Sequence, residues 1–194
     1  MCAFNRNELE SILKQRGLSD DWINIVLSGL PDDWSCRRKP YRNGEKCIFH
    51  AETKDPNEFK DAFNQELKDM EKKGKFDFIG FIFPKIDFSN TIFSKPTRFV
   101  GATFQAETDF MQAIFKEMVL FIGTEFQLQS ARFTKAHFEG TVAFIKTIFF
   151  VTSFSEAKFH DFVLFDGVEF LGGVFSMKLN SKKEYPLRTP RFGG

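Results

Sequence analysis

Three cysteines and one histidine in the N-terminal part of this sequence are its main candidates for holding a metal ion, ahead of the pair His137 and His160. Cys36, Cys47 and His50 follow a C-x10-C-x2-H spacing, and Cys2 offers a fourth ligand. Structural zinc sites use four cysteine and histidine ligands in a tetrahedron. The turn-prone stretch 42–46 would bring Cys36 towards Cys47. Two interpretations stay open: a structural zinc site, or cysteines that pack as small apolar side chains beside a histidine in a loop.

The sequence offers little support for a catalytic site. His137 and His160 flank Phe138 and Phe159, but no nucleophile or orienting carboxylate nearby completes a triad with them. The G-x-x-x-x-G-K-[ST] and G-x-G-x-x-G patterns of phosphate and dinucleotide sites are absent. We therefore expect a protein that is not an enzyme, with no small-molecule substrate and no cofactor besides the zinc considered above.

The second half of the chain must supply the scaffold, and phenylalanine dominates it. The sequence has 28 Phe against 2 Tyr and 2 Trp. From Phe83 to Phe175, Phe recurs at steps of five to seven residues, which fit neither the 3.6 period of a helix nor the period 2 of a strand. When these positions are assigned in turn to four faces, every step from the third to the fourth face is six residues long. The spacing predicts a coil with four sides and Phe side chains inside.

This repeat resembles the pentapeptide-repeat family, whose unit is close to A-[DN]-[LF]-x-x. The segments 102–106 (ATFQA), 131–135 (ARFTK) and 157–161 (AKFHD) match that unit. The resemblance covers residues 76–175 and implies an all-β, right-handed quadrilateral β-helix of about 4.5 coils. The sequence departs from the family pattern in that the residue before Phe is rarely Asp or Asn.

Residues 1–75 predict a small α-helical region that contains the Cys/His loop. Asn7 and Ser19 suit the starts of two short helices, and Asp55 followed by Pro56 marks a third. The third helix has an apolar stripe at helical spacing, formed by Phe59, Phe63, Leu67 and Met70. We expect this helix to cap the open end of the first coil, because a bare end invites aggregation.

One outer face of the solenoid is unusually apolar. Six residues that flank the Phe side chains of the fourth face form this stripe: Val100, Leu120, Ile122, Ala143, Ile145 and Leu164. Contiguous exposed apolar side chains usually mark interfaces, so we predict that the stripe binds a protein partner or a second copy of the chain. In the alternatives, the extra corner residue turns these side chains inward, or residues 176–194, a basic tail, fold back over them.

Charge argues against a nucleic-acid partner. The chain has 27 basic and 26 acidic residues, a net charge of +1. Residues 76–175 contain 8 basic and 11 acidic residues, a net charge of −3. A rod of about 20–25 Å that imitates DNA, as some members of the family do towards topoisomerases, would need about 12–15 negative charges. A DNA mimic and a structural zinc-containing adaptor are kept as alternatives to the main expectation, a non-enzymatic protein-interaction or structural module.

The expected compartment is the cytoplasm. The sequence begins without a secretory leader, and three cysteines are an odd number for a disulfide framework. Lys146 interrupts the longest apolar run, residues 142–154, so we expect no membrane span.

Overall fold

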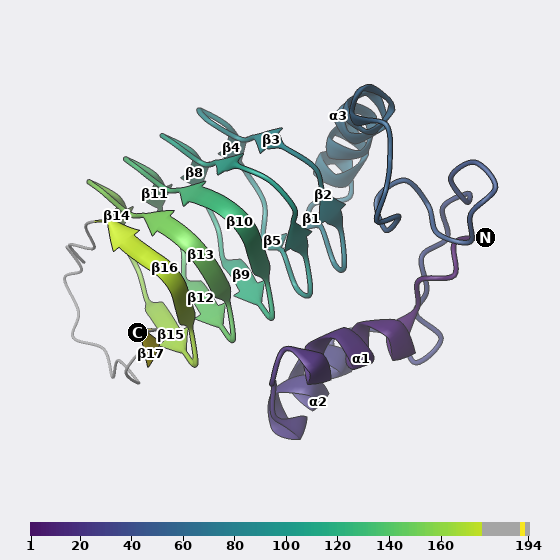
Figure 1. Ribbon diagram of the computed structural model, residues 1–194, viewed down its shortest axis with the longest axis horizontal. Coiled ribbons are helices and arrows are strands. Elements are labelled where there is room, and N and C mark those ends of the chain that lie inside the picture. Colours follow the sequence, from purple (N-terminus) through teal and green to yellow (C-terminus); the bar gives the residue numbers. More distant parts are fainter. Residues whose placement is uncertain (176–190, 193–194) are drawn as a thin grey trace.

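The structure is a computed structural model that describes residues 1–175 and 191–192. Three helices come first, namely α1 (Arg6–Gln15), α2 (Asp20–Ser28) and α3 (Pro56–Lys72), and a parallel β-solenoid of about four turns follows (Figure 1). The predicted fold class, a quadrilateral β-helix with a small helical region at its start, is confirmed. The basic tail expected over residues 176–194 lies outside the described residues, except for 191–192.

The strands of the described residues pair in parallel into three sheets. Two of these sheets each form one side of the solenoid, and the third forms two sides. The fourth face is the sheet of β1 (Phe76–Asp77), β5 (Thr97–Arg98), β9 (Val119–Ile122), β12 (Val142–Ile145) and β15 (Val163–Asp166). The third face contains β4 (Ile92–Phe93), β8 (Ile114–Phe115), β11 (His137–Phe138) and β14 (Lys158–Phe159). The first two faces share β2 (Ile82–Phe83), β3 (Ile86–Asp87), β6 (Thr103–Phe104), β7 (Thr108–Asp109), β10 (Glu125–Arg132), β13 (Ile148–Ser153), β16 (Glu169–Phe175) and β17 (Arg191–Phe192).

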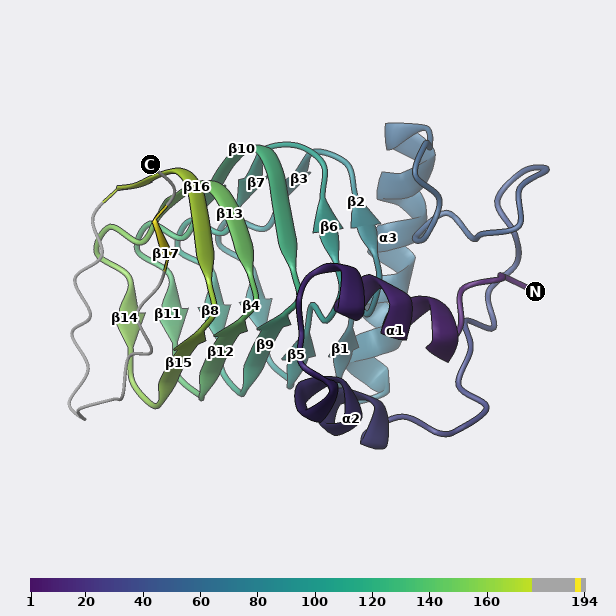
Figure 2. The same ribbon diagram turned by 60° about the horizontal axis from the view of Figure 1, so that its bottom comes forward.

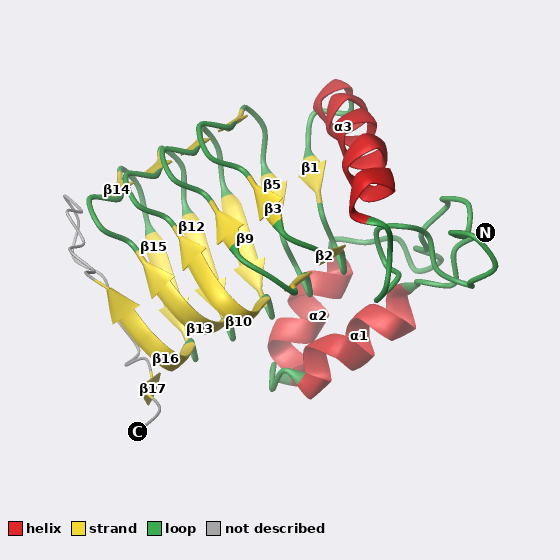
Figure 3. Ribbon diagram, turned by 45° about the horizontal axis from the view of Figure 1, so that its top comes forward, coloured by secondary structure: helices red, strands yellow, loops and turns green. Residues whose placement is uncertain are grey.

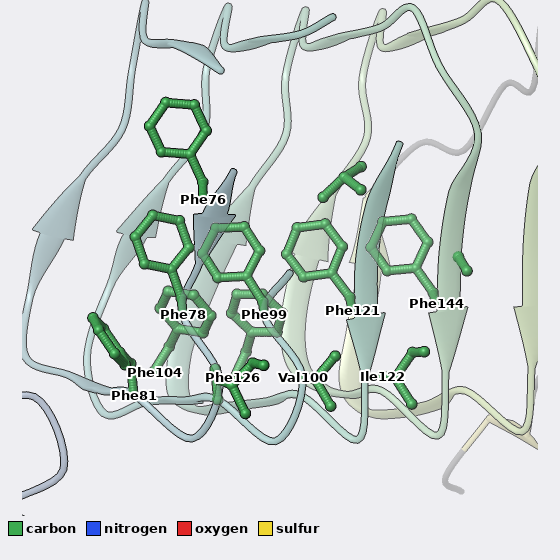
Figure 4. Packing of buried hydrophobic residues seen from close by; sticks show 14 of the residues in the cluster. Phe76, Phe78, Phe81, Phe99, Val100, Phe104, Phe121, Ile122, Phe126 and Phe144 are labelled. Atoms are coloured by element: carbon green, nitrogen blue, oxygen red, sulfur yellow. The ribbon is translucent and has the colours of Figure 1, made fainter. Parts of the chain in front are cut away.

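The strand register reproduces the four predicted Phe faces. On the first face, for example, Phe104 pairs with Phe126, which pairs with Phe149. Their rings lie nearly parallel, with centroids 4.5 and 4.9 Å apart. The fourth-face stack starts one coil earlier than the sequence predicted, at Phe78, whose ring stacks 4.8 Å from that of Phe99 (Figure 4). Burying each ring contributes about 1.5–3 kcal/mol, so the stacks hold the solenoid together along its length.

Side-chain caps fix where the three helices begin. Asn5, rather than the predicted Asn7, caps α1, because its side chain accepts hydrogen bonds from the backbone N–H groups of Asn7 and Glu8. Ser19 caps α2, and Asp55 caps α3 with Pro56 at its first position.

Helix α3 lies across the open end of the first coil (Figure 3). Its Phe63 ring lies 5.7 Å from that of Phe83 and 5.8 Å from those of Phe78 and Phe88. Phe63 therefore extends the aromatic core beyond the first coil of the solenoid. No helix within the described residues is long and apolar enough to cross a membrane.

Candidate functional site

The structure brings the four predicted metal ligands into one buried cluster. The ligand atoms of Cys2, Cys36, Cys47 and His50 all lie within 4.8 Å of one another. The Sγ atoms of Cys36 and Cys47 are 3.6 Å apart, and the Nδ1 atom of His50 lies 3.2 Å from Cys47 Sγ and 3.6 Å from Cys2 Sγ. The three cysteines are free thiols. Segments 45 residues apart in the sequence therefore converge on one point.

Backbone hydrogen bonds between three segments position the cluster. The N–H of Cys2 donates to the carbonyl of Arg38 at 2.8 Å, and the N–H of Cys36 donates to the carbonyl of Phe4 at 2.8 Å. The N–H of Cys47 donates to Cys2 Sγ at 3.1 Å. Residues 2–4 are thus hydrogen-bonded to the loop that contains Cys36 and Arg38, just before the chain enters α1.

Two aromatic contacts connect the cluster to the first coil. The Phe4 ring stacks on His50 with centroids 4.0 Å apart, and Phe4 is packed against Gly80 at the corner of the first coil. Phe49 stacks on Phe81 with centroids 4.7 Å apart. His50 Nε2 lies 3.1 Å from the carbonyl oxygen of Ile79, so the first coil also fixes the orientation of the imidazole.

The cluster stabilises the thiolate form of Cys36. The hydrogen bond between Cys36 and Cys47 lowers the pKa of the Cys36 thiol to about 3 and raises the pKa of the Cys47 thiol, because one sulfur bears the charge and the other keeps the proton. Burial lowers the pKa of His50, but hydrogen bonds with Cys2 and Cys36 outweigh burial and raise it. Thiolate is the form of cysteine that binds metal ions.

The apolar stripe of the fourth face is not the exposed surface that the sequence predicted. Val100, Ile122, Ala143 and Ile145 are at most 6% exposed, whereas Leu120 and Leu164 are half-buried. The prediction of exposure is wrong for the first four residues. Figure 2 shows α1 and α2 along this side of the solenoid beside β1, β5 and β9, and residues of α2 lie opposite Val100 and Ile122.

Neither alternative considered for the stripe included α1 and α2. Trp22 of α2 reaches across the stripe, and its Nε1 lies 3.2 Å from Oδ2 of Asp166. Asp166 is the partner of Ile145 in the strand register. Arg98, at the edge of the same face, points outward and pairs with Asp77 of the preceding coil, with Arg98 Nη2 2.7 Å from Asp77 Oδ2. Burial opposes ionisation of Asp77, but the hydrogen bonds from Arg98 outweigh it and lower the pKa of that carboxyl.

Close packing and one arginine fasten these two helices. A Cβ on Gly101 would lie 2.9 Å from Leu9 Cδ1, and one on Gly123 would lie 2.8 Å from Leu13 Cδ2. Arg16 donates to the carbonyls of Ala102, at 3.0 Å, and Gly123, and to Thr103 Oγ1 at 2.5 Å. No periodicity of α1 or α2 predicts this docking site, although glycines recur at 80, 101 and 123, one coil apart.

The family model of pentapeptide repeats matches residues 78–125 in 9 copies. Residues 78–125 are therefore pentapeptide repeats. No curated protein and no solved structure matches it. β-Solenoids of this family are generally non-enzymatic.

Part of the fourth face stays open beside α2. A cavity of about 130 Å³ lies between the helix and the face. Apolar residues from both sides line it, including Ile25, Val26, Leu30, Val100, Leu120 and Ile122. Ile25 lines this cavity and is itself 59% exposed to solvent.

The two histidines on the third face, His137 and His160, lie close to each other. Their ring centroids are 6.1 Å apart, and His137 lies in a shallow polar groove with Lys135, Glu156 and Lys158. Burial and the positive charge of Lys158 lower the pKa of His137. Two histidines beside two lysines form a poor site for a cation, because the lysines repel it.

Proposed function

We propose that this pentapeptide-repeat protein is a non-enzymatic interaction module that binds another protein, in the first instance a second copy of itself, beside α2. The observation that carries the proposal is the apolar cavity between α2 and the fourth face. Three residues of the predicted stripe, Val100, Leu120 and Ile122, line it. The solenoid acts as a rigid support for this surface.

The size of the cavity favours a protein side chain over a small molecule. Small-molecule sites usually have volumes of about 300–1,000 Å³, and this cavity has about 130 Å³. A single Leu, Met or Phe side chain suits that space. Anchors of this kind, in pockets near the centre of an interface, provide most of the binding energy in many complexes.

The apolar surface continues from the cavity across the fourth face. Met118 is 42% exposed and Phe162 is 49% exposed. Met118 and Phe162 directly precede β9 and β15, two residues before Leu120 and Leu164. In the register, Leu120 pairs with Ala143, which pairs with Leu164. Ala143 is buried, so the exposed apolar side chains belong to the coils on either side of it, those of Leu120 and Leu164, and together they offer a surface of the kind that marks interfaces.

DNA mimicry has weaker support. Acidic residues of the second face are neutralised by basic neighbours, since Arg132 Nη2 lies 2.7 Å from Asp109 Oδ2 and 3.0 Å from Glu107 Oε1. Lys85 also pairs with Glu107, at 3.2 Å. A surface that replaces DNA needs unpaired negative charge at high density.

The test is the solution mass of the chain, measured by light scattering over a concentration series. Leu120→Lys combined with Leu164→Lys places charge on the proposed interface without altering a buried residue. We expect a dimer for the wild-type chain and at least a tenfold weaker association for the double variant. Ile92→Lys is the matched control, because Ile92 is 53% exposed on the third face, and it should associate like the wild type.

Each other outcome has a defined meaning. A wild-type monomer would exclude self-association and leave a different protein as the partner. That partner must be retained by the wild-type chain and by Ile92→Lys but lost by the double variant. Equal binding by all three chains would contradict the proposed surface.

A further inference from the structure

We infer that Cys2, Cys36, Cys47 and His50 form a structural zinc site that fastens the N-terminal segment to the first coil of the solenoid. This inference is independent of the interaction surface proposed above. It assigns a metal ion to a place where three distant segments of the N-terminal region meet.

The spacing of the ligand atoms fits a tetrahedral zinc ion. With Zn–S bonds of about 2.3 Å and Zn–N bonds of about 2.0–2.1 Å, a tetrahedron has S···S edges of about 3.8 Å and S···N edges of about 3.6 Å. The S···S distance between Cys36 and Cys47 is 3.6 Å, and the Nδ1 atom of His50 lies 3.2 and 3.6 Å from two sulfurs. Small adjustments of side-chain torsions would bring the remaining pairs, all within 4.8 Å, to these values.

The surroundings of the four ligands support metal binding rather than simple packing. The Nε2 atom of His50 lies 3.1 Å from the carbonyl oxygen of Ile79. With the proton on Nε2, the imidazole donates a hydrogen bond to this carbonyl, and Nδ1 is left as the ligand atom. A zinc-bound histidine usually donates its other ring N–H in this way. Cys2 Sγ accepts from the N–H of Cys47 at 3.1 Å, and Cys36 Sγ accepts from Arg38 Nη1 at 3.4 Å. These donors offset the negative charge of three thiolates.

The donor set selects the metal and its role. Soft thiolate ligands with one imidazole favour zinc over the hard cations magnesium and calcium. Four protein ligands complete a tetrahedron, so the site leaves no position for a substrate and is structural. A depression of about 420 Å³, lined in part by Cys36 and His50, gives an ion a route from solvent.

A disulfide accounts for the cluster less well. It would join two of the three cysteines and leave the third thiol and the imidazole buried beside it without a role. The Cys36–Cys47 pair, at 3.6 Å between sulfurs, would have to close to about 2.05 Å. Zinc uses all four side chains at distances near those observed.

The experiment measures zinc bound to the full chain, purified under reducing conditions with zinc supplied. We expect one zinc per chain by plasma mass spectrometry, and less than a tenth of that in Cys36→Ser and in Cys47→Ser. His160→Ala is the matched control, because it removes a histidine from the solenoid surface, and it should keep one zinc. Wild-type content below a tenth of an ion in folded protein, or full content in either serine variant, would overturn the inference.

A second measurement decides the matter if the serine variants do not fold. Cobalt(II) added to the wild-type chain should bind in a 1:1 ratio and give the intense d–d bands and thiolate-to-cobalt charge transfer of a tetrahedral site with three sulfur ligands and one nitrogen ligand. Weak octahedral bands without charge transfer would contradict it. The double variant Leu120→Lys/Leu164→Lys should retain full zinc content, so failure of the interface and failure of the metal site are distinguishable.

Discussion

The solenoid and the N-terminal region are stabilised in opposite ways. In the solenoid, one contact is repeated from coil to coil, as when the Phe121 ring stacks 4.9 Å from both Phe99 and Phe144. In the N-terminal region each contact occurs once and joins distant residues, such as Arg16 and Gly123, 107 positions apart. The loss of one repeated contact should cost free energy locally and leave the other coils intact. The loss of one unique contact should release a whole segment from the surface that it covers.

Phe121→Ala should produce the largest loss of stability, because it tests the repeated contact itself. Phe121 is fully buried, and truncation of a buried Phe leaves a cavity and costs about 3–5 kcal/mol. Chemical denaturation followed by circular dichroism measures this free energy of unfolding. A loss below about 1 kcal/mol would contradict the stacked core.

Gly80→Ala should produce the next largest effect by disturbing a unique contact. A Cβ there would lie 2.1 Å from Phe4 Cζ, and the backbone of Gly80 has a φ of +66°. We expect roughly 2–4 kcal/mol of destabilisation from the clash and the left-handed backbone together. The thiols of Cys2, Cys36 and Cys47 should also become more reactive, because Phe4 no longer covers His50.

Gly74→Ala is the matched control for that variant. Gly74 has a φ of +75° but nothing within 4 Å of its added Cβ. It should show the backbone cost alone, about 1–2 kcal/mol, with unchanged thiol reactivity. Equal effects of the two alanine variants would mean that Phe4 does not seat on Gly80.

Arg16→Met should have the smallest of the three effects on stability. It removes the hydrogen bonds of Arg16 to the corner carbonyls of Ala102 and Gly123. We expect a net loss of about 0.5–1.5 kcal/mol, because water can bond these carbonyls once the helices loosen. We expect the loss to appear as faster amide exchange in α1 and α2 rather than in the centre of the solenoid. Arg37→Met, at an exposed position, should leave exchange unchanged, and uniform exchange across both regions would contradict a local role for Arg16.

The same contrast explains which features the sequence could predict. Each coil repeats one local geometry, so the spacing of Phe104, Phe126 and Phe149 was enough to assign a face. The sequence also singled out the four residues that the structure gathers into one cluster, although their approach depends on hydrogen bonds such as that from Cys2 N–H to the Arg38 carbonyl. The position of α1 and α2 could not be read in this way. It depends on contacts across more than 80 positions, such as those of Arg16 with Ala102 and Thr103, 86 and 87 positions away, which no periodicity encodes.

The stripe of the fourth face shows the consequence. Ile122 and Ile145 are buried, and the surface opposite Ile122 belongs to α2 of the same chain. An apolar stripe in a sequence predicts that something covers it and does not say whether the cover is internal. Leu120 and Leu164, at its margin, stay half-buried, and they are the part that another protein can reach.

Amide hydrogen exchange of the full chain, with and without a zinc chelator, tests the central claim most directly. If a metal centre holds the N-terminal region to a solenoid that is stable by itself, chelation should remove protection from α1, α2 and residues 31–54. The strands β8, β11 and β12 should stay protected, since their stacks do not depend on the cluster. Unchanged exchange in both regions, or equal loss of protection in both, would contradict the account.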